Sequence, residues 1–101
     1  MACRVTLAYM ILHELEDVIR SRQSADPAPS YTAKLLAEPE FNQRKIMEEA
    51  FEVCLELGRP EIHAGHLAGE AADLLYHLIT ALVGADVALA DVFAVLESRR
   101  S

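Results

Sequence analysis

The chain has 101 residues, enough for one domain and too few for two, so residues 1–101 are predicted to form a single domain. Hydrophobic residues make up 52% of the sequence, which excludes a disordered chain and indicates, at this length, that another subunit covers part of the apolar surface. The formal net charge of −7 suits a site that collects divalent cations and argues against binding to nucleic acid or anionic membranes, which need clustered Lys and Arg.

The first predicted element is an amphipathic helix over residues 6–21, because six apolar side chains recur there at helical spacing. These are Leu7, Met10, Ile11, Leu15, Val18 and Ile19. The apolar start is not read as a signal peptide, since the polar run from His13 to Asp17 follows it without a small-residue cleavage site. No run reaches the roughly 18 uninterrupted apolar residues of a membrane span, so a cytoplasmic protein is expected.

Proline and glycine residues divide the rest of the chain into four further predicted helices. Pro27 and Pro29 lie in the first break, and Pro39, Gly58 and Gly84 separate the helices that follow. These helices are predicted over residues 31–36 (with Ser30 as N-cap), 40–57, 63–83 and 88–99. Because no segment alternates apolar and polar residues with period two, the predicted fold class is all-α, a bundle of about five helices.

The helix predicted over residues 63–83 is apolar around nearly its whole circumference from Ala68 to Val83, apart from one polar stripe. A helix of this kind is buried on more than one side. The chain has few other long helices to supply that cover, so a second copy is the expected source. The sequence therefore predicts a homodimer that shares a helical bundle.

Two acidic stripes lie on the two longest predicted helices. The helix over residues 40–57 carries one within about 60° of arc, formed by Lys45, Glu49, Glu52 and Glu56, with Glu48 beside Glu52. The helix over residues 63–83 carries the other, equally narrow, formed by His66, Glu70, Asp73 and His77. The second stripe runs through an otherwise apolar helix, so it is predicted to face the interior of the bundle.

Facing carboxylates of this number need a compensating charge, because like charges repel at these spacings and an uncompensated buried carboxylate is costly. Mg²⁺, or Mn²⁺, fits best because it prefers oxygen ligands. A di-iron site would need Glu-x-x-His pairs, and zinc would need paired Cys and His, none of which occur. The first stripe taken alone is more typical of a solvated helix face. Cys3 and Cys54 are predicted to be free thiols, with Cys54 a small core residue.

The motif Glu48-Glu49-x-x-Glu52, followed by Glu70-x-x-Asp73, resembles the signature of the all-α, MazG-like nucleotide pyrophosphohydrolases. Within that superfamily, nearly the whole chain, from about residue 10 to residue 99, is similar to the phosphoribosyl-ATP pyrophosphohydrolase family. The similarity lies in three segments: Leu15-Glu16-Asp17-Val18-Ile19-x-x-Arg22, Ser30-Tyr31-Thr32-Ala33-Lys34-Leu35-Leu36, and Glu70-Ala71-Ala72-Asp73-Leu74-Leu75-Tyr76-His77.

This resemblance implies hydrolysis of phosphoribosyl-ATP to phosphoribosyl-AMP and pyrophosphate, the second step of histidine biosynthesis. It implies that Mg²⁺ is held by Glu49, Glu52, Glu70 and Asp73. Glu48 is implied to support the ligands or to orient the attacking water, which makes Glu48, Glu49 and Glu52 the catalytic candidates. The substrate-binding candidates are Arg22, Tyr31, Thr32, Lys34, Lys45 and His77.

Several alternatives stay open at this point. Lys45 is equally well placed to pair with Glu49 as to neutralise phosphate. Tyr31 and Thr32 could serve helix capping and packing, and His77 is more typical of a satisfied core histidine. At the level of function, the alternatives are a house-cleaning pyrophosphohydrolase for another nucleoside triphosphate and a helical dimerisation module without catalysis.

Overall fold

The computed structural model describes residues 4–100, and in this range it contains five α-helices and no strand. The helices are α1 (Arg4–Ser21), α2 (Tyr31–Ala37), α3 (Pro39–Leu57), α4 (Ala64–Gly84) and α5 (Leu89–Ser98). The all-α class is therefore confirmed, and each predicted boundary lies within two residues of the observed one. Cys3 lies outside the described residues.

Local hydrogen bonds explain where the helices begin and end. The Ser30 hydroxyl caps α2 by accepting from the backbone N–H of Ala33 at 3.1 Å. The ring of His63 caps α4 in the same way, because its Nδ1 accepts from the backbone N–H of His66 at 3.1 Å. Although α4 ends at Gly84 as expected, the residue with left-handed backbone is Asp86 (φ 59°), a residue type that tolerates this conformation.

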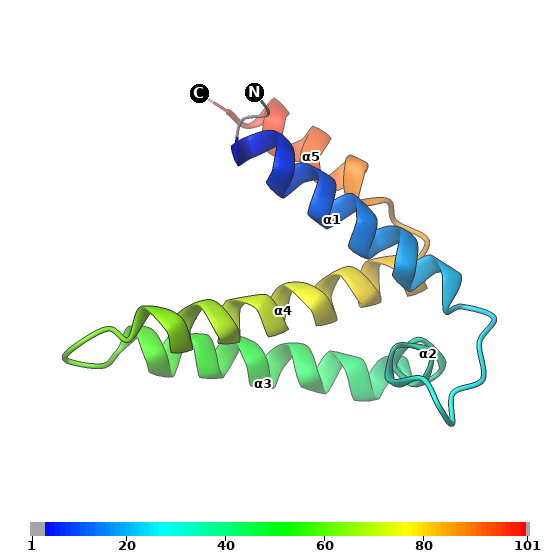
Figure 1. Ribbon diagram of the computed structural model, residues 1–101, viewed down its shortest axis with the longest axis horizontal. Coiled ribbons are helices and arrows are strands. Elements are labelled where there is room, and N and C mark those ends of the chain that lie inside the picture. Colours follow the sequence, from blue (N-terminus) through cyan, green and yellow to red (C-terminus); the bar gives the residue numbers. More distant parts are fainter. Residues whose placement is uncertain (1–3, 101) are drawn as a thin grey trace.

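The chain forms two diverging arms, which Figure 1 shows from the side. One arm is the antiparallel pair of α3 and α4, whose connection forms the free end of the arm, and α2 packs across the other end of this pair. The second arm contains α1 and α5, and α1 packs on the C-terminal part of α4. The core at this junction contains Ile19, Ile79, Val83 and Leu89, with Leu12, Leu15, Leu36, Tyr76 and Phe93 packed against it.

A buried carboxylate connects α1 to the start of α5. Glu16 is 6% exposed, and its Oε2 accepts from the backbone N–H of Leu89 at 2.6 Å. The residue at the N-cap position of α5, Ala88, has no side chain that can cap, so Glu16 satisfies this helix start across 73 positions of sequence. The edge of the His13 ring also contacts Phe93, with 5.8 Å between the ring centroids.

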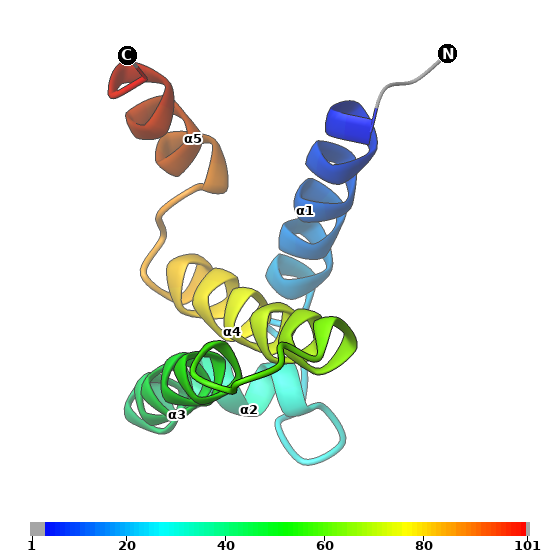
Figure 2. The ribbon, with the colours of Figure 1, turned by 90° about the vertical axis from the view of Figure 1, so that its left-hand side faces the viewer.

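Many large apolar side chains are exposed on the arms. Figure 2 shows α1 and α5 diverging towards the two ends of the chain. The exposed side chains include Leu7, Met10, Ile11 and Val18 of α1, Leu75 and Leu78 of α4, Val95 and Leu96 of α5, and Met47, Phe51 and Leu55 of α3.

The prediction that Cys54 is a core residue was wrong, because the helical phase of α3 places it about 60° from Phe51 on an exposed side.

Among the described residues, α4 is the helix long and apolar enough, by length and composition, to cross a membrane. This is weak support for a membrane span, since the core helix of a soluble protein passes the same test. The helix also carries Glu70 and Asp73 on one side and packs against α3 along its length. These features are those of a helix that contributes to a site within the bundle.

Candidate metal and substrate site

The centre of the α3–α4 arm brings three carboxylates together. Because the two helices are antiparallel, a residue before the connecting loop on α3 faces a residue equally far after it on α4. Glu49 of α3 therefore meets Glu70 and Asp73 of α4, and one oxygen of each lies within 4.8 Å of the others. Glu49 is 8% exposed, whereas Glu70 is half-buried and Asp73 is exposed.

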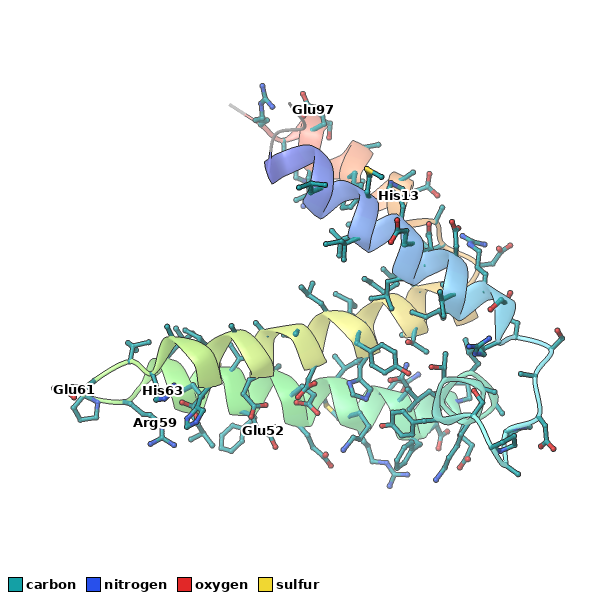
Figure 3. All side chains as sticks on the ribbon, viewed as in Figure 1. His13, Glu52, Arg59, Glu61, His63 and Glu97 are labelled. Atoms are coloured by element: carbon teal, nitrogen blue, oxygen red, sulfur yellow. The ribbon has the colours of Figure 1, made fainter. Side chains whose placement is uncertain are left out.

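The fourth predicted metal ligand, Glu52, interacts with this cluster from its solvent side. Its side chain is exposed and lies midway along the α3–α4 arm (Figure 3). A hydrogen bond to Glu52, followed by burial and the negative charge of Glu52, raises the pKa of Glu70 to about 7. Burial, followed by the charges of Glu52 and Asp73, also raises the pKa of Glu49. The four carboxylates therefore resist carrying full negative charge together.

The donor set of this cluster fits a hard divalent cation. Glu49 Oε2 and Glu70 Oε2 are buried and have no hydrogen-bond partner among the described residues. Buried polar atoms are normally satisfied, so two unpartnered carboxylate oxygens in one cluster point to an ion as their partner. An all-oxygen set of carboxylates is the type that Mg²⁺ and Mn²⁺ prefer.

Two ion pairs flank the cluster along α3. The Lys45 ammonium lies 3.3 Å from Glu48 Oε2, so the ion pair is with Glu48 and the alternative of a pair with Glu49 was wrong. The hydrogen bond from Lys45 to Glu48 raises the pKa of Lys45, which keeps it cationic. Nearer the connecting loop, Arg59 Nε lies 3.0 Å from Glu56 Oε2, and Figure 3 places Arg59 at the free end of the arm.

Two side-chain hydrogen bonds join α2 to α4 one helical turn beyond Asp73. The Tyr31 hydroxyl lies 3.0 Å from His77 Nε2, and the Thr32 hydroxyl is hydrogen-bonded to the Tyr76 hydroxyl. His77 is 5% exposed, and its Nδ1 lies 2.8 Å from the backbone oxygen of Asp73. The segments singled out in the sequence at residues 30–36 and 70–77 therefore contact each other directly.

Lys34, Arg22 and His66 take no part in these hydrogen bonds between α2 and α4. Lys34 places its ammonium 4.8 Å from the ring centroid of Phe41, near the start of α3. Arg22 is exposed beyond the end of α1, and its guanidinium donates to the neighbouring Ser21 hydroxyl at 3.3 Å. His66 is exposed and stacks on His63, with 3.7 Å between the ring centroids.

The predicted burial of the second acidic stripe was correct for His77 only. Glu70 is half-buried, and both Asp73 and His66 are exposed. The physical reason is that the stripe follows one edge of the contact between α3 and α4, and α2 covers this edge only at the His77 end.

Two residues of this region were not identified from the sequence. Asn42 is 2% exposed, and its side-chain N–H donates to the backbone oxygen of His77 at 3.2 Å. Tyr76 is the hydrogen-bond partner of Thr32. A signal for Asn42 existed, because it lies two helical turns before Glu49 on the same face of α3. Tyr76 lies in the segment 70–77 that carries the family resemblance, but no role was assigned to it, since a tyrosine in an apolar helix is usually a packing residue.

Comparisons with known proteins identify a family and relatives of this chain. A model of the family described as phosphoribosyl-ATP pyrophosphohydrolase matches residues 12–100. A protein of Cereibacter sphaeroides (strain ATCC 17029) is 48% identical over 90 residues, which cover 88% of this chain and 85% of the relative. A protein of Ruegeria sp. (strain TM1040) is 45% identical over 91 residues, covering 89% of this chain and 85% of the relative. Both relatives carry the name phosphoribosyl-ATP pyrophosphatase.

Proposed function

Because the chain belongs to the phosphoribosyl-ATP pyrophosphohydrolase family, we propose that it hydrolyses phosphoribosyl-ATP to phosphoribosyl-AMP and pyrophosphate in histidine biosynthesis. The observation that carries this proposal is the cluster of Glu49, Glu70 and Asp73, whose oxygens lie within 4.8 Å inside the matched region. The activity is that of a hydrolase acting on a phosphoanhydride bond.

The cofactor in this proposal is Mg²⁺, with Mn²⁺ as a substitute. Glu49, Glu70 and Asp73 would hold it directly, and Glu52 would complete the set, as its effect on the pKa of Glu70 supports. When bound, the ion supplies positive charge that polarises the phosphoryl oxygens and stabilises the pyrophosphate leaving group. The unpartnered oxygens of Glu49 and Glu70 are the support for this assignment.

The protein side chains supply the remaining parts of the reaction. Water attacks the α-phosphorus, the bond to the bridging oxygen of the β-phosphate breaks, and that oxygen leaves with pyrophosphate. Glu48 is 60% exposed in its side chain and lies one residue from Glu49, so it can accept the proton of a water that approaches from solvent. Lys45, held beside Glu48, neutralises a phosphate oxygen.

The remaining candidate substrate-binding residues lie at the end of the site nearest α2. Tyr31, Thr32 and His77 form the contact between α2 and α4, one helical turn from Asp73. Lys34 and Arg22 are the cations on the α2 side of the site that we assign to the more distant phosphate of the substrate. Each of these assignments is open to substitution experiments.

The proposed working form is a homodimer in the cytoplasm. Large apolar side chains are exposed on both arms, among them Ile11, Leu75 and Leu96, and exposed apolar surface of this kind is typical of a subunit interface. A second copy packed between the arms would cover them, because a two-fold interface pairs the same surface on both subunits.

The experiment that tests the function is pyrophosphate release from freshly made phosphoribosyl-ATP with and without Mg²⁺, beside ATP, dUTP and dCTP. We expect Mg²⁺-dependent release from phosphoribosyl-ATP and its loss in Glu49→Gln and Asp73→Asn proteins that still fold. Glu61→Gln is the matched control, since Glu61 is an exposed acid at the free end of the same arm (Figure 3). Release mainly from a simple nucleotide would indicate a house-cleaning pyrophosphohydrolase, and no release from any of the four nucleotides would refute the proposed function.

A further inference from the structure

The hydrogen-bond directions at His77 follow from the chemistry of its two partners. The backbone oxygen of Asp73 can only accept, so His77 Nδ1, 2.8 Å away, must carry the ring proton and donate it. In a neutral imidazole the other nitrogen, Nε2, then has a free lone pair. The Tyr31 hydroxyl, 3.0 Å from Nε2, is therefore the donor of that hydrogen bond. This is the less common tautomer of a free histidine, held here by the backbone of α4.

The direction of this bond determines what Tyr31 offers to a ligand. Its only hydroxyl proton points at His77, so the oxygen presents lone pairs on its other side. Tyr31 is 46% exposed, so a ligand in solvent can reach its side chain. An oxygen in this state accepts hydrogen bonds from O–H or N–H groups and repels a phosphate oxygen.

The position of Tyr31 relative to the carboxylates selects the part of the ligand that it meets. Its partner His77 lies one helical turn beyond Asp73, about 6 Å along α4. Lys45, Glu49 and Glu48 are also near enough for their charges to act on Tyr31. In a nucleotide whose α-phosphate lies at the cluster, the next group along the molecule is the sugar, and its hydroxyls are hydrogen-bond donors.

We propose that His77 is a positioning residue that makes the Tyr31 hydroxyl a hydrogen-bond acceptor for a sugar hydroxyl of the bound nucleotide. The inference rests on the proposed function for its substrate and goes beyond it in assigning His77 no direct contact. Both ring nitrogens of His77 are already occupied, and the residue is 5% exposed, so it acts through Tyr31. The side-chain N–H of Asn42 on α3 donates to the backbone oxygen of His77 and so helps to hold this residue in place.

The first test is spectroscopic and needs no substrate. Nitrogen-detected NMR of the histidine rings at about pH 8.5, where an ordinary imidazole is neutral, reports which nitrogen carries the proton. We expect one ring, absent from the spectrum of His77→Gln protein, to carry its proton on Nδ1. A proton on Nε2 of His77 would overturn the proposal, since Tyr31 would then accept from His77 and keep its own proton free.

The second test is a kinetic cycle on the full-length protein with phosphoribosyl-ATP. Tyr31→Phe and His77→Phe should each raise KM about 5- to 20-fold and leave kcat within about threefold, because a ground-state contact to the sugar is lost. The KM of the double variant should be no higher than that of the single variant with the higher KM, since both changes remove the same contact. His77→Gln restores an acceptor near Tyr31 and should recover most of the affinity.

Tyr76→Phe is the matched control for a purely structural role. It removes the adjacent hydrogen bond between the same two helices, that of Thr32, and leaves the His77 ring unchanged. We expect its KM to stay within about twofold of wild type, because the loss of one partly buried side-chain hydrogen bond changes helix docking little. A KM in Tyr76→Phe protein raised as far as in His77→Phe protein would show that His77 merely docks α2, which overturns the proposal.

The two proposals fail in different ways. Wild-type protein that releases no pyrophosphate from phosphoribosyl-ATP would refute the proposed function. Wild-type activity combined with unchanged KM in Tyr31→Phe and His77→Phe proteins, or with additive effects in the double variant, would refute only the role of His77.

Discussion

Replacing Glu16 by alanine tests whether the buried carboxylate of α1 stabilises the start of α5, the C-terminal helix. The change removes the acceptor for the backbone N–H of Leu89, a residue that is 5% exposed. A buried donor left without a partner costs about 1–3 kcal/mol. The ion pair of Glu16 with Arg20, which is 37% exposed in its side chain, adds little because solvent screens it. The expected loss is therefore about 2 kcal/mol of unfolding free energy, dominated by the orphaned N–H.

The assay is thermal unfolding of both proteins at the same protein concentration. For a domain of this size each kcal/mol shifts Tm by about 4–8 °C, so Glu16→Ala should lower Tm by about 8–16 °C. Glu16→Gln keeps an oxygen acceptor and should lose about half as much. The control is Asp17→Ala, which removes an exposed carboxylate from the next position of α1 and should leave Tm nearly unchanged.

The pH dependence follows from the sign of the shift. The hydrogen bond from Leu89, and then the charge of Arg20, hold the pKa of Glu16 below its usual value of 4.5. The stabilisation by Glu16 is therefore complete above about pH 4.5 and is lost as the pH falls through the lowered pKa of the folded state. Equal Tm values for wild type and Glu16→Ala at pH 7, or an equal loss in Asp17→Ala, would refute this account of how α5 is held.

Three further predictions concern the site and the assembly. Mg²⁺ affinity, measured by calorimetry, should increase about tenfold for each unit that the pH is raised towards 7 and should be constant above pH 7, because the pKa of Glu70 is about 7 and binding must displace its proton. In Glu52→Gln protein the pH at which the affinity becomes constant should be lower, and an affinity that does not change with pH would contradict the raised pKa of Glu70. Lys45→Met should raise KM for phosphoribosyl-ATP about tenfold with a smaller change in kcat, because a cation near the phosphate is lost. Arg59→Met, at the free end of the arm, should leave KM unchanged, and an equal rise of KM in both variants would show that Lys45 does not contact the phosphate. Leu75→Arg should shift the sedimentation of the protein from dimer to monomer at micromolar concentration, whereas a dimer that persists would place the interface elsewhere.

Much of the fold was readable from local sequence features. Pro39, Gly58 and Gly84 mark helix ends because they act on the backbone within one or two residues, and Ser30 caps α2 for the same reason. The acidic stripes were also visible, because 3.6 residues per turn aligns side chains along a helix whatever surrounds it. The three-residue cluster of Glu49, Glu70 and Asp73 then required only that the two helices be antiparallel and in register.

Only the tertiary structure decided the interactions that depend on how the helices meet. The pairing of Lys45 with Glu48, the exposure of Cys54 and the partner of Glu16 all depend on which face of a helix meets a neighbour, and helical periodicity leaves that choice open. The hydrogen bond between the Tyr31 hydroxyl and His77 Nε2 depends on the packing of α2 across α4, which no local feature of either segment sets. Sequence by itself determined the helices, their caps and the carboxylates, because these are local properties of the chain. The direction of hydrogen bonds and the pKa values arose only when separate segments were packed together and shielded from water.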